Sequence, residues 1–257
     1  MVDDAQLASY AASYAEEGFV LVKGLLDKAE AAQYREESHA LIKRLNRDAD
    51  PTWGSARELA MGNQTELKHC HDVQFYAAAF ARLIIDPRFT DVAAAVMGTP
   101  NVQLHHTKLF IKPPEKGSPF PLHQDHPFFP HAKHSMGAAI FHFDDAPLAK
   151  GCVRVVPGSH KNGPLAHASE GSFHLPFSEW PLEKSVPCEA EAGDVLFFTY
   201  LTVHGSGVNT TDQARTTLLV QYRDPEDPPT TDMHTNSLGQ GMILRGVDPT
   251  CRSEVSP

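Results

Sequence analysis

Two histidines and one aspartate in this sequence have the residue types and the spacing of a metal site. His123 and Asp125 stand two residues apart in the stretch LHQDHPFFPH. If this stretch is a strand, alternate residues project from the same face, so both side chains can reach one ion while Gln124 points elsewhere. A pair of this kind is common by chance, and a third ligand is needed. His204, which precedes Gly205-Ser206-Gly207, is the candidate.

This ligand set favours iron over zinc. Two imidazoles and one carboxylate occupy one side of an ion and leave coordination positions open, which suits Fe(II) that must bind a chelating cosubstrate and O₂ together. Zinc, the alternative metal, is more often held by four closed ligands or by three ligands and a water. A zinc hydrolase would also need a general base beside the metal, and the chain has no HExxH segment.

An arginine near the third ligand suggests an anion site. Arg215 lies eleven residues after His204 and opens the β-rich run RTTLLVQY. Taken alone, it would be a surface residue. Beside an open iron site, its guanidinium becomes a candidate for the distal carboxylate of 2-oxoglutarate, because its fork matches a carboxylate with two parallel hydrogen bonds.

Strands must position these residues, and from residue 101 onward the sequence changes from a helical to a strand-like pattern. Before residue 101, apolar periodicity predicts a short strand at 19–22, a loop at 48–63, and helices over 3–17, 27–45, 73–85 and 90–97. After it, short apolar runs between Pro and Gly clusters predict strands near 103–112, 120–125, 136–144, 152–156, 186–190, 195–200, 202–208 and 215–223.

About eight strands in this order predict a jelly roll. We therefore expect a mainly β fold with flanking α-helices, in one domain that spans residues 1–257. Its parts are a mainly helical segment at 1–100, a jelly-roll core at 101–224 and an irregular tail at 225–257.

The composition limits the partners. The net charge of −10 argues against a nucleic acid, which normally meets a basic patch, and no window is apolar enough for a membrane span. The four cysteines are scattered and predict reduced thiols, and the acidic N-terminus has no secretory pattern. We expect a cytoplasmic protein with a small-molecule partner, and the sequence does not indicate an oligomeric state.

The ordered motifs resemble those of the phytanoyl-CoA dioxygenase family of Fe(II)- and 2-oxoglutarate-dependent oxygenases. The likeness runs from about residue 10 to 224, and its segments include HHTKLFIKPP, PLHQD, GCVRVVPGSHK, GDVLFF and HGSGVN, followed by Arg215. It implies a double-stranded β-helix of cupin type, wrapped by N-terminal helices. It also implies Fe(II), 2-oxoglutarate and O₂ as cofactors, with His123, Asp125 and His204 as iron ligands.

The resemblance also implies roles around the metal. Gln124 matches a glutamine that contacts 2-oxoglutarate, and Ser206 matches a serine that helps Arg215 hold the distal carboxylate. Phe141 stands where related enzymes place a tryptophan against the cosubstrate. Lys108 stands where a neutral residue packs on 2-oxoglutarate, and its cation could pair with the cosubstrate. The expected pocket residues are His126, Phe128 and His106.

The function that follows is oxidation, by default hydroxylation, of an aliphatic C–H in a small or medium-sized metabolite, with release of succinate and CO₂. Alternatives are 2-hydroxylation of an acyl-CoA, and oxidative cyclisation, epimerisation or desaturation in natural-product biosynthesis. Asp125 argues against halogenation, because related halogenases replace this carboxylate with a small residue. A non-enzymatic cupin-type binding protein is a further alternative, but it would need no carboxylate clamp. A second metal set at His69, His71 and Asp72 is disfavoured, because these residues stand at the entry of an expected helix.

Overall fold

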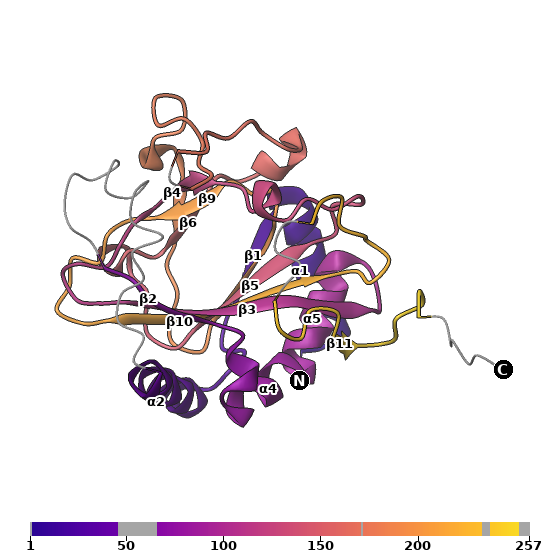
Figure 1. The fold of residues 1–257 in the computed structure, drawn as a ribbon, viewed down its shortest axis with the longest axis horizontal. Helices are drawn as coiled ribbons and strands as arrows, with labels where there is room; N and C mark the ends of the chain where they lie inside the picture. The colour runs from indigo at the N-terminus through magenta and orange to yellow at the C-terminus, as the bar shows by residue number, and fades with distance from the viewer. Residues whose placement is uncertain (1, 46–65, 171, 233–236, 252–257) are drawn as a thin grey trace.

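Two antiparallel sheets and a layer of helices make up the part of the chain that the computed structural model describes, residues 2–45, 66–170, 172–232 and 237–251 (Figure 1). The larger sheet has the order β1 (Phe19–Val22), β8 (Val195–Thr199), β5 (Gly137–His142), β10 (Arg215–Arg223), β3 (Val102–Lys112) and β11 (Ile243–Arg245), with β2 (Lys68–His71) also paired to β3. The smaller sheet has the order β4 (Phe120–His123), β9 (His204–Ser206), β6 (Val153–Val155) and β7 (Val186–Cys188).

From β3 onward the chain passes back and forth between the two sheets. Strands β3, β5, β8 and β10 belong to the larger sheet, and β4, β6, β7 and β9 belong to the smaller one. Every pairing between these described strands is antiparallel. Residues far apart in sequence, such as those of β4 and β9, are therefore brought side by side.

The N-terminal half supplies the helices, and local capping sets their ends. Helix α1 (Asp4–Glu17) and helix α2 (Lys28–Arg44) each begin with a capping box, from Asp3 and from Asp27. Helix α1 ends at Gly18, which has a φ of 82°. Helices α4 (Ala78–Ile84) and α5 (Pro87–Met97) follow, and Pro87 occupies the first turn of α5, where its missing N–H costs nothing.

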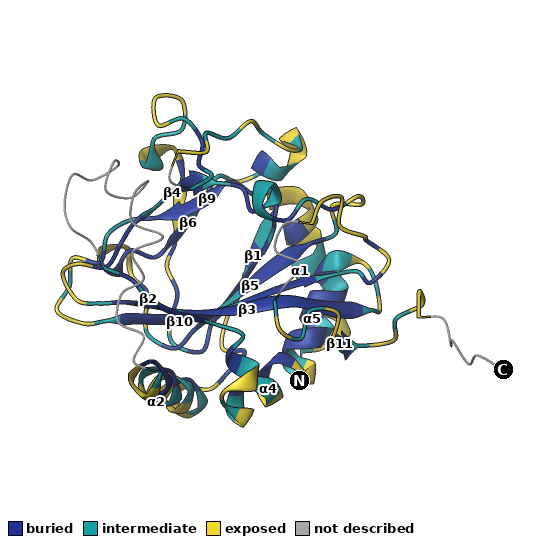
Figure 2. Cartoon of the chain, in the orientation of Figure 1, coloured by how far each residue is buried: buried dark blue, intermediate teal, exposed yellow. Residues whose placement is uncertain are grey.

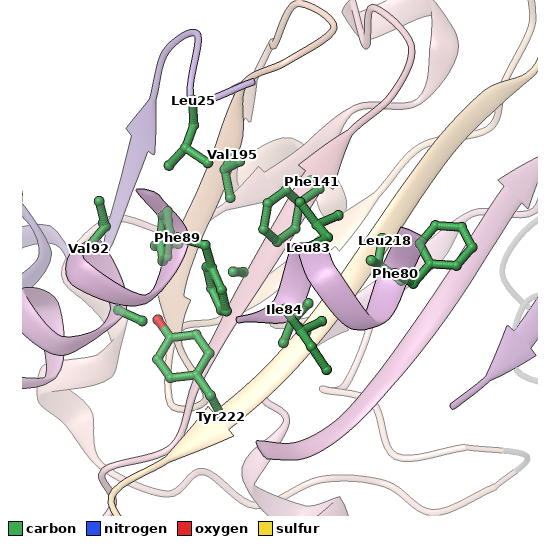
Figure 3. Close-up of a cluster of buried hydrophobic side chains, with 14 of the residues drawn as sticks. Leu25, Phe80, Leu83, Ile84, Phe89, Val92, Phe141, Val195, Leu218 and Tyr222 are labelled. Atoms are coloured by element: carbon green, nitrogen blue, oxygen red, sulfur yellow. The ribbon is translucent and has the colours of Figure 1, made fainter. Parts of the chain in front are cut away.

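The main hydrophobic core lies between these helices and one face of the larger sheet. Phe80 of α4 and Phe89 of α5 are fully buried against strand residues that include Phe141 and Tyr222 (Figure 3). The ring centroids of Phe89 lie 5.3 Å from Phe141 and 5.8 Å from Tyr222. The strands are largely buried and the helices expose their outer sides (Figure 2). One face of the larger sheet is thus closed by apolar packing, and the other faces the smaller sheet.

The mainly β prediction is confirmed, and a strand forms in each of the eight expected places and at 19–22. The helix expected over 73–85 is wrong in part, because extended backbone at Ala77 separates a 3₁₀ turn, Val73–Phe75, from α4. Strands β2 and β11 were not expected, and β11 lies in the tail predicted to be irregular. The predicted loop at 48–63 lies outside the described residues. None of the described helices is long and apolar enough to cross a membrane.

Candidate metal centre and adjoining pocket

The structure brings the three predicted ligands together. His123 ends β4 and His204 begins β9, and the two are register partners with ring centroids 4.3 Å apart. Asp125 Oδ1 lies 3.7 Å from the Nε2 atom of each histidine. One potential ligand atom from each residue lies within 4.8 Å of the others, and this is the single such cluster found in the described part of the chain.

Backbone carbonyls orient both imidazoles toward a common point. His123 Nδ1 lies 2.8 Å from the Pro121 carbonyl oxygen, and His204 Nδ1 lies 3.0 Å from that of Thr202. Since a carbonyl can only accept, each Nδ1 carries the proton, and each Nε2 presents its lone pair to the centre. Burial lowers the pKa of His123 to about 3 and that of His204 to about 4, so both are neutral at physiological pH, as metal binding requires.

Asp125 reaches the centre by a different route from the one expected. Strand β4 ends at His123, and Asp125 has helical dihedral angles, with φ −75° and ψ −21°, at the start of the 3₁₀ turn His126–Phe128. Its backbone N–H donates to the Tyr200 carbonyl at 3.0 Å. The alternation of a strand therefore does not bring Asp125 beside His123, and the turn held by Tyr200 does.

Gln221 is a functional candidate that the sequence reasoning missed. Its Nε2 donates to Asp125 Oδ2 at 2.6 Å, which leaves Oδ1 directed toward the histidines. Burial raises the pKa of Asp125, so this carboxylate depends on its hydrogen bond and on a cation for compensation. The signal was spacing, because Gln221 stands six residues after Arg215 on one strand and an even separation places both on the same face.

A pocket of about 170 Å³ adjoins the metal centre between the two sheets. Every second residue of β10 from Arg215 to Gln221 lines it, and so do alternate residues of β3. Aromatic rings form much of the remaining wall. The lining residues are His71, His106, Lys108, Phe110, Phe120, His123, Asp125, Phe128, Phe129, Ile140, Val153, Phe198, His204, Gly205, Ser206, Arg215, Thr217, Leu219, Gln221 and Ser237.

Arg215 is a buried cation in this lining, only 3% exposed. One Nη1 N–H donates to the Gly151 carbonyl, while Nε has no hydrogen-bond partner in the described structure. Burial lowers the pKa of Arg215 to about 10. A buried guanidinium with an unused donor calls for an anion, and a carboxylate fits its fork.

Lys112 is a second buried cation, which the sequence reasoning did not identify. It is 0% exposed and is the register partner of Arg215 across β3 and β10. Its Nζ donates to Ser206 Oγ and to the Gly207 carbonyl, each at 2.7 Å. Because Lys112 donates to one lone pair of Ser206 Oγ, the Ser206 hydroxyl proton is free to be donated to another acceptor. The Ser206 hydroxyl can therefore donate a hydrogen bond to an anion, which is the role expected for it.

The structure corrects the prediction for Gln124. Its Nε2 donates to the carbonyls of Gly163 and Leu201 at 2.9 and 2.7 Å, and its Oε1 accepts from the Leu165 N–H at 2.8 Å. The side chain is fully buried and does not line the pocket. Gln124 therefore joins the segment after β6 to the loop before β9 and is engaged by the protein itself.

The prediction for Phe141 is also wrong, because this residue lies on the face of the sheet opposite the pocket. It packs against Phe89 in the helix-covered core (Figure 3) and is not a pocket-lining residue. The neighbouring residue, His142, pairs with the pocket residue Thr217. Burial, with a smaller contribution from the charge of Arg215, lowers the pKa of His142 to about 3. An error of one residue reverses the face on a strand.

Some of the residues expected in or near the pocket line it, and one does not. Phe128 and His106, which were expected in the pocket, line it, and so does Lys108, which was expected to contact the cosubstrate. His126 does not, because the chain turns after Asp125 and the His126 ring packs 5.4 Å from the rings of both His134 and Tyr200. His71 also lines the pocket.

The residues present fit Fe(II) and a dicarboxylate. Two neutral imidazoles and one carboxylate with a single unengaged oxygen could hold the ion and would leave other positions on it open, as in two-histidine, one-carboxylate iron sites. The unused Nε–H of Arg215, in the same pocket, provides a place for a second, distal carboxylate. A chelating cosubstrate could therefore reach from the ion to the guanidinium.

Known proteins resemble this chain in sequence. A family model described as phytanoyl-CoA dioxygenase matches residues 14–217. The peroxisomal phytanoyl-CoA dioxygenase of Rattus norvegicus is 29% identical over 230 residues, which cover 81% of this chain and 66% of that protein. A probable phytanoyl-CoA dioxygenase of Caenorhabditis elegans is 33% identical over 153 residues, 54% of this chain and 49% of that protein. The matches thus span about half to two thirds of these relatives.

A solved structure matches nearly the whole chain. The epimerase SnoN, in a crystal structure with Fe³⁺, alpha ketoglutarate and nogalamycin RO, has a TM-score of 0.74 and 26% identity, covering 96% of this chain and 98% of that one. The family match extends over most of the sequence, including the three candidate metal ligands and Arg215. The chain belongs to the phytanoyl-CoA dioxygenase family.

Proposed function

We propose that this protein is an Fe(II)- and 2-oxoglutarate-dependent dioxygenase that oxidises an aliphatic C–H bond of a small or medium-sized metabolite. The observation that carries the proposal is one pocket with two ends. Two imidazoles with directed Nε2 atoms and one carboxylate oxygen converge at one end, and a buried arginine with an unused N–H lines the same pocket. A structural metal needs no such arginine, and this argues against a cupin-type binding protein.

The architecture fits a double-stranded β-helix, the jelly roll expected from the sequence. In this interpretation β3 to β10 are the eight strands, with β3-β10-β5-β8 as one sheet and β4-β9-β6-β7 as the other. The remaining strands, β1, β2 and β11, extend the larger sheet, and the helices support it. The chain is then one domain whose two sheets place ligands and clamp on facing walls.

Each side chain of the site has a defined task. His123, Asp125 and His204 would hold Fe(II), while Arg215 and Ser206 would hold the distal carboxylate of 2-oxoglutarate, with Lys112 orienting Ser206. Bound together, Fe(II), 2-oxoglutarate and O₂ supply an oxidant able to remove hydrogen from an unactivated carbon, with formation of succinate and CO₂. The protein contributes positioning and the exclusion of water by the aromatic walls.

The substrate would occupy the side of the pocket lined by aromatic rings. Phe128 and Phe129 offer apolar surface there, and His106 and Lys108 add polar groups. This mixture favours a compact, partly polar molecule. The resemblance to the epimerase SnoN over nearly the whole chain supports oxidative epimerisation or cyclisation as the second candidate reaction. An acyl-CoA is the second candidate substrate class. A cytoplasmic location stays a prediction.

The test is metal-dependent cosubstrate binding and turnover. Anaerobic Fe(II) and 2-oxoglutarate should give the visible absorption band of their chelate with the wild-type protein. Aerobic incubation with a metabolite panel should form succinate, with product masses that gain one oxygen, lose two hydrogens or stay unchanged. His204→Gln should lose both signals, whereas His134→Gln, an exposed histidine outside the pocket lining, should keep them. A wild-type protein without the band, or a fully active His204→Gln variant, would refute the proposal.

A further inference from the structure

We propose that Gln221 fixes the coordination mode of Asp125 and at the same time recognises a hydroxyl or N–H group of the substrate. The inference rests on the proposed function and deepens it, because it assigns a positioning and specificity-determining residue to the same site. Three observations carry it: the contact with Asp125, the unused oxygen of Gln221, and an irregularity in the strand pairing at this point.

The contact with Asp125 defines how the Gln221 amide is turned. Nε2 lies 2.6 Å from Asp125 Oδ2, and Gln221 is fully buried. An ionised carboxylate has no donor, so the NH₂ group must face Asp125 and the amide oxygen must face away from it. Asp125 Oδ2 is thereby occupied, and Oδ1 is the oxygen that lies 3.7 Å from both histidine Nε2 atoms. Asp125 is held as a ligand through one oxygen, which keeps positions on the ion open for the cosubstrate and O₂.

The other side of the amide is unsatisfied. Gln221 Oε1 is buried and has no hydrogen-bond donor among the described residues, although Gln221 lines the pocket. A buried amide oxygen without a donor is costly, and native structures normally satisfy such atoms. Because Oε1 belongs to the group that touches the iron-ligating carboxylate, a substrate that satisfies it would be held beside the metal. The missing partner is an O–H or an N–H.

The strand pairing is distorted at this residue. Gln221 pairs with His106 and the next residue, Tyr222, pairs with Leu104, so β3 carries one extra residue, His105, opposite this point of β10. Such a bulge interrupts the ladder and re-aims a side chain, and bulges are common beside active sites. Elsewhere the β3–β10 register is continuous from Arg215 to Gln221. The irregularity thus coincides with the residue that contacts Asp125.

The chemistry narrows the substrate class. An alcohol, an amine or an amide can donate to Gln221 Oε1, whereas the thioester and alkyl chain of an acyl-CoA offer no donor close to the carbon that would react. A site built to hydrogen-bond a substrate O–H or N–H rejects analogues that lack it, because its own polar group is left unpaired. The structure therefore assigns this enzyme to donor-bearing metabolites over acyl-CoA thioesters.

The positioning role is tested with Co(II), a redox-stable probe of the site. Gln221→Met, which keeps the length and removes the amide, should weaken Co(II) binding roughly 10- to 100-fold, as loss of a partner behind a metal ligand does. It should also change the Co(II) absorption spectrum, because Asp125 becomes free to bind through both oxygens. Gln213→Met, the same substitution at an exposed glutamine outside the pocket lining, should match the wild type in both measurements.

Recognition of a donor is tested with matched fragments. Pairs of an alcohol and its methyl ether, and of a secondary amide and its N-methyl form, are titrated into protein loaded with Ni(II) and 2-oxoglutarate. The wild type should prefer the donor member about tenfold, the value of one net hydrogen bond, and Gln221→Met should lose the preference. Equal binding of the two members, or a preference that survives in Gln221→Met, overturns this part.

Different results would contradict the proposed function and the role of Gln221. A wild-type protein that does not bind Co(II) and 2-oxoglutarate contradicts the proposed function. A wild-type protein that binds both, together with a folded Gln221→Met variant of equal Co(II) affinity and unchanged spectrum, contradicts the inference alone. Thermal unfolding of each variant without metal shows whether it is folded, and Gln221→Glu provides an isosteric second variant that places a carboxylate against Asp125 and should also weaken Co(II) binding.

Discussion

Replacing Arg215 with methionine should weaken 2-oxoglutarate binding and stabilise the metal-free protein at the same time. The guanidinium is buried, and no ion pair to it is found in the described structure. Lys112 faces it across the strand pair, so a second cation adds to the positive potential. A bound anion would compensate the positive charge, and without one the buried charge lowers the stability of the folded protein.

The magnitudes follow from burial and from the hydrogen bonds. Burial lowers the pKa of Arg215 from 12.5 to about 10, and at about 1.4 kcal/mol per pKa unit the folded protein carries a cost of about 3 kcal/mol for the charge. Methionine removes this cost but leaves the Gly151 carbonyl unpaired, which offsets about 1 kcal/mol. The net gain of about 2 kcal/mol should raise the melting temperature by roughly 4–8 °C. Loss of a charge-assisted bond worth about 2 kcal/mol should weaken 2-oxoglutarate binding roughly 30-fold.

Two measurements test this prediction, and opposite changes are expected in them: the stability should rise and the affinity should fall. Thermal unfolding of the metal-free protein reports the stability, and anaerobic titration of 2-oxoglutarate into the Fe(II)-loaded protein reports the affinity. Arg154→Met is the matched control, because Arg154 lies on β6 of the smaller sheet, bonds to Ser185 and does not line the pocket. A destabilised Arg215→Met variant with wild-type affinity for 2-oxoglutarate would show that Arg215 supports the fold and not the cosubstrate.

Three further predictions concern the surroundings of the site. Lys112→Met should weaken 2-oxoglutarate binding, and its effect should not add to that of Ser206→Ala, because the two groups share one hydrogen bond; additive losses in a double-mutant cycle would contradict this. Gly205→Ala places a Cβ 2.6 Å from a carbonyl oxygen of β4 and should abolish Co(II) binding by moving β9, whereas Gly207→Ala, with open space, should retain it; equal Co(II) binding by both would refute the argument. Burial lowers the pKa of His142 to about 3. Since an unfolded histidine protonates near ~6.5, its stabilising contribution is present above that pH and is lost as pH falls, at up to about 1.4 kcal/mol per pH unit. His142→Gln should flatten the pH dependence of the unfolding free energy between pH ~6.5 and ~5, and an unchanged slope in denaturant titrations would oppose this.

Several site residues were accessible from the sequence because their signals are local. The His123–Asp125 spacing, the strand that leads to His204 and the position of Arg215 are patterns within short segments. The strands of both sheets were predictable for the same reason, since Pro and Gly clusters separate short apolar runs. The unexpected strands β2 and β11 lack this signal. They are four and three residues long and exist because β3 offers edges to pair with.

Residues whose role depends on pairing between distant strands were not accessible in this way. Lys112 contacts Ser206 across 94 positions of sequence, and Gln221 contacts Asp125 across 96. Phe141 was placed on the wrong face because the choice between it and His142 rests on the register of β5 against β10. Gln124 sits beside two ligands in sequence, yet the turn that begins after β4 directs it into the loops around Gly163 and Leu201.

Local patterns in the sequence were enough to predict candidate ligands, the order of the strands and a cation near His204. They did not predict which side chains share the pocket. Successive strand residues point to opposite faces, so a shift of one residue in register, or a turn after a strand, changes which surroundings a side chain contacts. Register is set by pairing between segments about a hundred residues apart, as between β3 and β10, and a local pattern does not carry that information.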